Sequence, residues 1–300
     1  MTNNQKYVLY ASNASVNATF LPYESSYSLN YNGPGASAVV LLYGGSSITP
    51  SSDWGSGVYV APNVILSAAH VLYDSHNVFT VSDSTVSSNG TISSMLYKGN
   101  PAGGSTDSQD FSLGNTSDSS SGAVGFFGVT ASTLKKLPKI IQGELSSTTI
   151  VGFPAFYTQD EDNYTINPSA GDRTGQDGNV YSPVGPIKSY LSNVNAAQFS
   201  SYNTADDNLN APQSAFAAGK WSSSSVFATQ GNSGGPLFAM NNGEQYVAGL
   251  ETFAITNANN TNFLESGGVI FNTKEISTLT QDIKNADQNG KKSEIGRAHV

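Results

Sequence analysis

Short runs of β-branched, apolar and aromatic residues recur along the chain. They cover residues 38–43, 57–61, 64–67 and 78–81 in the first half, and 148–153, 225–228, 236–240, 246–250 and 268–271 in the second. Gly, Pro, Asn and Ser bound these runs, which is typical of strands joined by turns. Short strands at this spacing predict barrels or sandwiches, not alternating strand–helix units.

Three polar stretches interrupt these runs. Residues 1–32 are predicted to be an N-terminal extension or pro-segment, and residues 115–122 a linker or surface loop. Residues 155–221 are long and poor in strand-like runs, which predicts loops inserted between strands. Acidic positions in that stretch lack the spacing of calcium ligands, so no metal site is predicted.

One helix is predicted near the end of the chain, over residues 273–287. Asn272 and Glu275 form a capping box at its start. A single apolar stripe follows at helical spacing, made of Ile276, Leu279 and Ile283. Residues 288–300 are interpreted as a tail, and residues 295–300 are what one frame of a common sequencing adapter encodes. We interpret these six residues as a library artefact; the alternative is a native tail.

Composition supports an all-β protein. Charged residues make up only 12% of the chain, whereas Gly, Tyr and Phe number 30, 15 and 14. The net charge of −9 comes without a basic stripe, so a nucleic-acid partner is not expected. Cysteine is absent, which excludes disulfides and thiolate metal sites. No apolar run predicts a membrane span, and no signal peptide is visible, although the Ser/Thr/Asn-rich composition suggests an extracellular bacterial protein.

The strongest chemical pattern is the segment Gly-Asn-Ser-Gly-Gly, in which Ser233 is a candidate nucleophile. A nucleophilic serine needs a tight turn, and the N–H groups of Gly231 and Ser233 would point at a developing oxyanion. The bare Gly-x-Ser-x-Gly pattern also describes the nucleophile elbow of α/β-hydrolases, in which the histidine follows the serine. Here only His299 follows Ser233, and it lies in the suspect tail.

His70 is the candidate general base, because it ends an apolar run and precedes the serine. His76 lies in a polar segment and is expected at the surface. Asp110 opens a strand-like segment after a Gly/Ser-rich loop, where its carboxylate would accept the Nδ1–H of the histidine. Asp107 is the rival for this role.

Three segments carry a resemblance to a known family, namely residues 55–72, 110–113 and 231–238. They resemble trypsin-like serine proteases, and most closely the cysteine-free bacterial branch that includes the glutamyl endopeptidases. The resemblance covers roughly residues 36–283. It implies two six-stranded antiparallel β-barrels, chymotrypsin-like, with barrel one over about 33–135, barrel two over about 136–271, and the whole domain over 33–287.

The same resemblance implies a catalytic triad of Ser233, His70 and Asp110 with oxyanion-hole donors Gly231 and Ser233. It implies protein or peptide substrates, a monomer, and no cofactor. The expected function is therefore serine endopeptidase activity through an acyl-enzyme. The alternatives are a protease-fold binding or adhesin module that has lost activity, and an esterase.

Substrate specificity is only weakly encoded. The family resemblance places Phe227, Ala228, Glu251 and Phe253 around the pocket for the side chain that precedes the cleaved bond. Glu251 stands roughly where glutamyl endopeptidases carry histidine, and an acid there would repel a glutamate substrate. The alternative is that Glu251 points to solvent. Asn232, where animal trypsins have aspartate, cannot form their activating ion pair.

Overall fold

The structure is a computed structural model, and the statements below concern the residues that it describes. These are residues 6–8, 15–17, 28–29, 33, 35–48, 53–61, 63–82, 85–97, 110–117, 148–154, 157–159, 173–174, 180–183, 188–192, 200–201, 215–220, 231–241, 244–256, 263–270 and 281.

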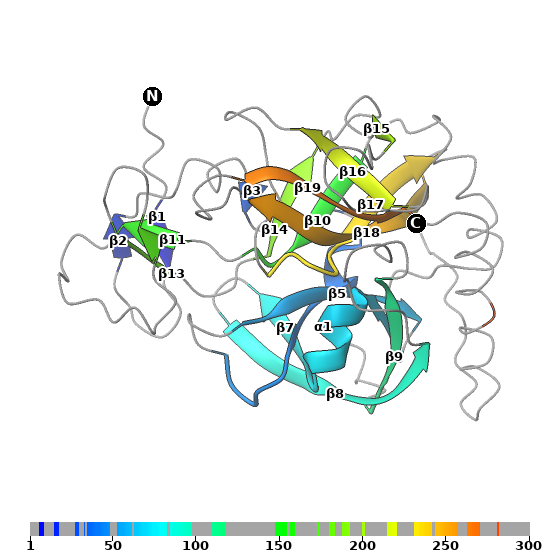
Figure 1. Cartoon of the computed structure of the whole chain (residues 1–300). Coiled ribbons are helices and arrows are strands. Elements are labelled where there is room, and N and C mark those ends of the chain that lie inside the picture. The colour runs from blue at the N-terminus through cyan, green and yellow to red at the C-terminus, as the bar shows by residue number, and fades with distance from the viewer. Residues whose placement is uncertain are drawn as a thin grey trace.

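The first half of the chain forms a closed barrel of six antiparallel strands (Figure 1). In barrel order the strands are β4 (Val39–Tyr43), β5 (Gly55–Ala61), β6 (Val64–Ser67), β9 (Ser112–Thr116), β8 (Thr85–Tyr97) and β7 (Asn77–Ser82). A 3-10 turn, η2 (Ala36–Ala38), leads into β4, and a short helix, α1 (Ala69–Asp74), follows β6.

Strands β4, β5 and β6 are the almost completely buried part of the barrel wall. Their side chains are buried throughout, with Tyr43 alone half-buried. Val, Ile and Leu dominate β4 and β6, because branched side chains pack well on a pleated surface. Phe111 and Leu113 join this core from the segment that forms β9. The rigid core fixes the places where β6 ends and β9 begins, and both places matter for the site.

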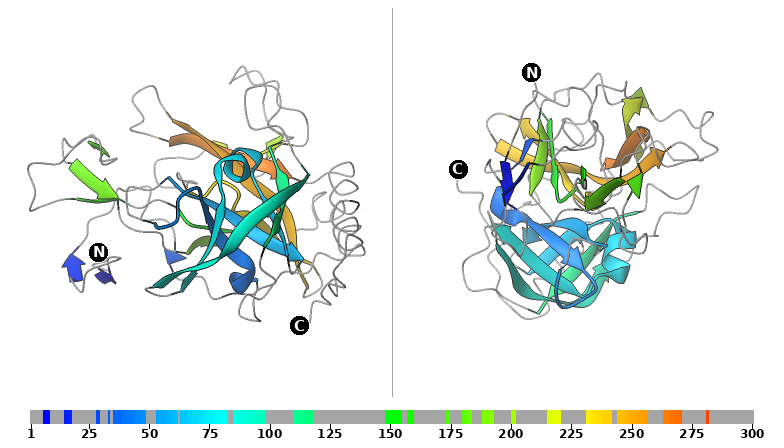
Figure 2. Two further views of the ribbon diagram at one scale, coloured as in Figure 1. Left: turned by 90° about the horizontal axis from the view of Figure 1, so that it is seen from below. Right: turned by 90° about the vertical axis from the view of Figure 1, so that its left-hand side faces the viewer.

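The second half forms an eight-stranded antiparallel sheet, which lies against the barrel in all three views (Figures 1 and 2). Its strands in order are β15 (Ser200–Ser201), β16 (Ala215–Lys220), β19 (Phe263–Ile270), β18 (Glu244–Thr256), β17 (Pro236–Asn241), β10 (Thr148–Gly152), β14 (Ser189–Ser192) and β3 (Ser28–Leu29). The central strands β10, β17 and β18 supply buried core residues such as Val151, Leu237 and Leu250.

Two small sheets complete the described elements. One pairs β1 (Lys6–Val8) with β2 (Ser15–Asn17). The other places β13 (Val180–Pro183) between β11 (Tyr157–Gln159) and β12 (Arg173–Thr174).

The prediction of a mostly β protein is confirmed, and four of the predicted runs correspond to the barrel strands β4, β5, β6 and β7. Strand β6 has the predicted bounds, 64–67. Strand β8 was not predicted, because its many Ser, Thr and Asn residues lack an apolar run. Residues 155–221, predicted to be poor in strands and to carry inserted loops, contribute β14, β15 and β16 to the sheet. Residues 115–116, predicted as linker, belong to β9.

Other expectations lie partly or wholly outside the described residues. Strand β3 comes from the predicted N-terminal extension and pairs with β14. Within the described part of the second half, the strands form the eight-stranded sheet and the small β11-β13-β12 sheet, and no second closed barrel. The helix predicted over residues 273–287 falls outside that part, except for Gln281, whose backbone is helical.

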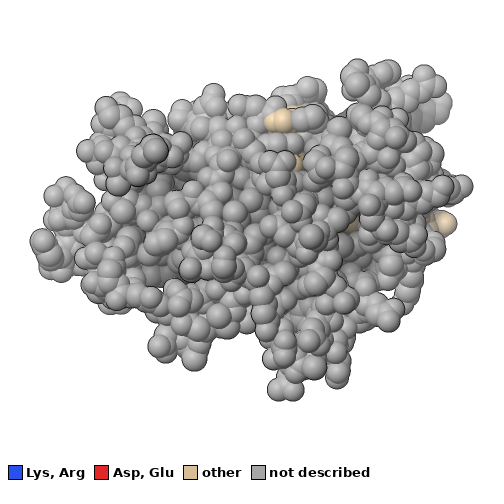
Figure 3. All heavy atoms as spheres, turned by 90° about the horizontal axis from the view of Figure 1, so that it is seen from above, with Lys and Arg blue, Asp and Glu red and all other residues tan. Residues whose placement is uncertain are grey.

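Two further observations on the described residues concern membrane-spanning helices and surface charge. No helix among the described residues combines the length and the apolar character needed to cross a membrane. On the face in Figure 3, the described residues that come into view carry uncharged side chains.

Candidate active site

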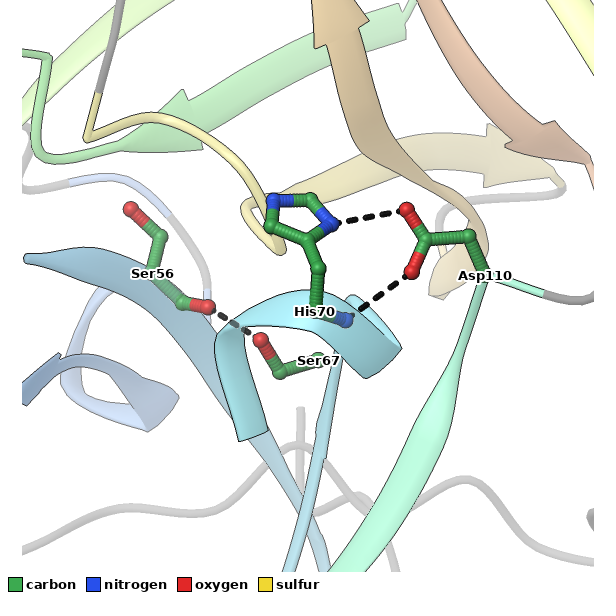
Figure 4. Close-up of polar contacts among 4 residues, drawn as sticks. All are labelled: Ser56, Ser67, His70 and Asp110. Carbon is green, nitrogen blue, oxygen red and sulfur yellow. Dashed lines mark hydrogen bonds and ion pairs between the residues drawn. The ribbon is translucent and has the colours of Figure 1, made fainter. Parts of the chain in front are cut away.

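His70 and Asp110 meet at one end of the barrel (Figure 4). His70 is the second residue of α1, which begins just after β6 ends. Asp110 directly precedes β9, and β9 pairs with β6 so that Ser112 lies opposite Ser67. This register places Asp110 beside the start of α1. The topology of the barrel therefore brings together two residues that lie forty positions apart in the sequence.

The Asp110 carboxylate contacts His70 twice. Its Oδ1 accepts the backbone N–H of His70 at 3.0 Å, and its Oδ2 lies 2.8 Å from the ring Nδ1. An ionised carboxylate can only accept hydrogen bonds, so this contact assigns the ring proton to Nδ1. The other ring nitrogen, Nε2, is then the basic one.

The two partners differ in exposure. The Asp110 side chain is 0% exposed, whereas that of His70 is 36% exposed. Burial shields the carboxylate from competing water, while the imidazole remains accessible to a molecule arriving from solvent. This combination suits a histidine that exchanges a proton with a bound substrate.

Ser233 lies at the corner of a tight turn that precedes β17. The turn spans Asn232 to Gly235 and is closed by the N–H of Gly235, which donates to the carbonyl of Asn232 at 2.8 Å. Gly234 is its third residue and has φ of +83°. That angle matches the third position of a type II turn, which glycine adopts without steric cost. Ser233 therefore occupies the second, protruding position of the turn.

Gly234 brings this turn against the entrance of α1. A Cβ atom added to Gly234 would lie 3.0 Å from the backbone nitrogen of Ala68 and would overlap Ser67 Oγ and the carbonyl oxygen of Ser56. The absence of a side chain thus allows the serine turn to pack two residues before His70. Among the described contacts there is no hydrogen bond between Ser233 Oγ and His70, and such bonds often form only with substrate.

The hydrogen bond that closes the turn also fixes the direction of the Ser233 N–H group. The carbonyl of Asn232 faces Gly235 N–H, so in a trans peptide the N–H of Ser233 points the opposite way. Gly231 has φ of +88°, and its Cα packs on Phe153 and Trp54. Within the described residues, the N–H groups of Gly231 and Ser233 have no hydrogen-bond acceptor. Among the described residues, nothing therefore competes for the two predicted oxyanion donors.

Glu251 borders the same turn from β18. Its carbonyl accepts the N–H of Gly234 at 2.6 Å, and its own N–H donates to the carbonyl of Gly235 at 2.9 Å. The side chain is 2% exposed, so the alternative that it points to solvent was wrong. Neither carboxylate oxygen has a partner among the described residues. Burial raises the pKa of this carboxyl well above its usual range.

We expect Glu251→Gln to stabilise the protein at pH 8 by about 1 kcal/mol or more. In the wild type, folding retains a proton that the unfolded chain releases near pH 4.5. The free energy of unfolding should therefore fall as pH rises above that value, until the buried carboxyl ionises. Glutamine stays neutral at every pH, so its advantage should vanish toward pH 4. Melting temperatures from pH 4 to pH 8 test this, and parallel curves for the two proteins would contradict it.

The remaining predicted residues lie in less defined positions. Phe227, Ala228 and Asp107 are outside the described residues, and Phe253 is described only as part of the β18 backbone. His76 is exposed, as predicted.

The sequence analysis missed Ser56, which holds the serine turn from β5. A small polar residue between Gly55 and Gly57, close before the histidine segment, was the available signal.

Among the described residues, no cluster of three or more His, Asp or Glu side chains could hold a metal ion. In comparisons with protein-family models and with curated proteins, nothing matches this chain.

Proposed function

We propose that this protein is a serine endopeptidase with Ser233 as nucleophile, His70 as general base and Asp110 as the residue that orients the histidine. The observation that carries the proposal is the buried Asp110 carboxylate on Nδ1 of a half-exposed histidine, next to the turn that presents Ser233. A surface histidine with a structural role has no need of a fully buried carboxylate that binds both its ring and its backbone.

The proposed reaction is acyl transfer. Ser233 Oγ attacks the peptide carbonyl carbon while Nε2 of His70 takes the hydroxyl proton. The carbonyl oxygen becomes an oxyanion, which accepts hydrogen bonds from the N–H groups of Gly231 and Ser233. The C–N bond then breaks, and His70 gives its proton to the leaving amine. Water attacks the acyl-enzyme by the same path in reverse and frees the second product.

We further infer that the fold is the two-barrel, chymotrypsin-like one, with the eight-stranded sheet supplying the second barrel. His70 and Asp110 border the first barrel, and Ser233 lies in the turn that leads into β17 of the sheet. The substrate would then bind where barrel and sheet meet. An extracellular location also remains part of this proposal.

A fluorophosphonate probe tests the function directly, because it reacts covalently only with an activated serine. We expect one label, on Ser233 by peptide mapping, and loss of labelling in Ser233→Ala. Casein digestion by the same two proteins, followed by mass spectrometry of the peptides, should give cleavage by the wild type alone. The peptides would also reveal the residue preceding the cleaved bond.

Failure of both assays would favour the binding-module alternative, once a masked site is excluded. For this purpose residues 1–27 should be removed, because residues 28–29 form β3 and pair with β14 in the sheet. Protein that starts at Ser28, is folded by circular dichroism, and neither labels nor cleaves would overturn the proposed function.

A further inference from the structure

Ser56 connects the barrel to the serine turn through more contacts than its size suggests. It lies in β5, is completely buried, and takes part in four hydrogen bonds outside its own sheet ladder. In one of these bonds, the hydroxyl of Ser67 donates to the Ser56 carbonyl at 2.6 Å. In Figure 4 the Ser56 hydroxyl points away from that carbonyl and from Ser67.

The other three contacts reach the turn and its support. The Ser56 hydroxyl donates to the carbonyl of Gly231 at 2.8 Å and accepts the N–H of Phe153 at 2.9 Å. The backbone N–H of Ser56 donates to the carbonyl of Ser233 at 2.8 Å. A hydroxyl has one proton to donate, so its donation to Gly231 is fixed once Phe153 supplies the N–H. Ser56 therefore holds the carbonyl groups of both residues whose N–H groups would bind the oxyanion.

Glycine at position 231 makes this contact important. Its φ of +88° lies in a region that other residues avoid, and glycine itself rotates between many backbone conformations. Gly231 has no side chain of its own that could restrain the peptide that follows it. The hydroxyl of Ser56 supplies that restraint, because rotation of the peptide would break the bond to the Gly231 carbonyl and leave a buried oxygen unpaired.

Phe153 ties the same contact to the sheet. It follows β10, its N–H donates to Ser56, and its carbonyl accepts the indole N–H of Trp54 at 2.7 Å. The Gly231 backbone packs directly on this Trp54–Phe153 pair. Ser56 thus lies among hydrogen-bonded residues from both halves of the molecule. Through its bond to Gly231 it fixes the position of the turn relative to them.

We propose that Ser56 is the positioning residue of the oxyanion hole. Its hydroxyl holds the Gly231 carbonyl toward the protein, and this keeps the N–H groups of Gly231 and Ser233 directed together at the substrate oxygen. This role rests on the proposed peptidase function. It makes Ser56 a residue that acts through Gly231 and touches no substrate.

The test is Ser56→Ala, with Ile65→Val as the control for stability. Alanine keeps the backbone bond to Ser233 but removes both hydroxyl contacts. We expect kcat to fall about 10- to 100-fold with KM changed less than about threefold, because a displaced donor weakens only the transition state. Ile65 is a buried β6 residue that pairs with Tyr59 and Gly114 of the barrel, and its truncation costs about 1 kcal/mol of stability, similar to a lost hydrogen bond.

A transition-state analogue gives a readout that lost stability alone would not move. The affinity for a peptide aldehyde, whose adduct places an oxyanion in the hole, should fall in Ser56→Ala by the same factor as kcat/KM. Affinity for the product peptide should stay unchanged, and Ile65→Val should match the wild type in all three measurements.

The outcomes separate the role of Ser56 from the function itself. Ser56→Ala could instead keep the wild-type kcat and aldehyde affinity while its melting temperature falls to that of Ile65→Val. Ser56 would then be only a structural residue, and the proposed peptidase function would be unaffected. Folded protein that starts at Ser28 and hydrolyses neither peptides nor activated esters would overturn the function and the role of Ser56 together. A proportional loss of kcat and aldehyde affinity supports the proposal.

Discussion

Asp110→Asn is expected to lower kcat for peptide hydrolysis about 10⁴-fold while the protein stays folded. The carboxylate now accepts two N–H groups of His70, one from the backbone and one from the ring. In the asparagine variant the oxygen can keep the backbone bond, and the NH₂ group then faces Nδ1. It donates there, which forces the ring proton onto Nε2. Nε2 can no longer take the proton of Ser233, so the general base is lost.

Asp74→Asn is the matched control, because Asp74 belongs to the same helix as His70 and is exposed. It makes the same chemical change without touching the imidazole and should keep kcat within about twofold. Circular dichroism and melting curves should show both variants folded. An Asp110→Asn protein that retains a tenth or more of wild-type kcat would remove Asp110 from the proposed triad and reopen the case for Asp107.

Gly234→Ala is expected to destabilise the protein by about 3 kcal/mol or more. The positive φ of Gly234 costs an alanine about 1–2 kcal/mol. Its methyl group would also overlap Ser67 Oγ and the carbonyl of Ser56, and such overpacking typically costs about 1–3 kcal/mol more. For a chain of this size, a loss of about 3 kcal/mol lowers the melting temperature by about 5 °C. Thermal unfolding followed by circular dichroism measures it.

Gly90→Ala separates the two costs. Gly90 has φ of +111° in β8 and is half-buried, so alanine there should bear the backbone cost alone, about 1–2 kcal/mol. Equal losses for the two variants would mean that the turn does not press against the entrance of α1. In that case the nearness of Ser233 to His70 would lose its main support.

Part of the barrel could be predicted from the sequence, because strands β4 and β6 are almost entirely apolar. The residues of β4 and β6 are buried on nearly all sides, so an uninterrupted run of Val, Ile and Leu signals them directly. Strand β8 is half exposed and rich in Ser and Thr, and its pairing with β7 and β9 decides its structure. Strands β14 and β16 are likewise set by partners far along the chain, which local patterns cannot reveal.

The candidate site divides in the same way. His70, Asp110 and Ser233 could be proposed from the sequence because their residue types have distinctive chemistry. Their order along the chain favoured the chymotrypsin arrangement over that of the α/β-hydrolases. The burial of Glu251 did not follow, because a glutamate in a strand is normally placed toward water. The role of Ser56 did not follow either, since an ordinary serine gains its importance only from the turn packed against it.

The peptide bond between Ser233 and Gly234 is held from both sides, by Ser56 of the barrel through its oxygen and by Glu251 of the sheet through its nitrogen. Neither half of the molecule can therefore fix the Ser233 turn alone. In a chain whose halves have not yet docked, neither bond forms, and Ser233 would lie in a loose, glycine-rich loop. If the protein is the peptidase that we propose, newly synthesised chains cleave neither one another nor other proteins until folding is complete.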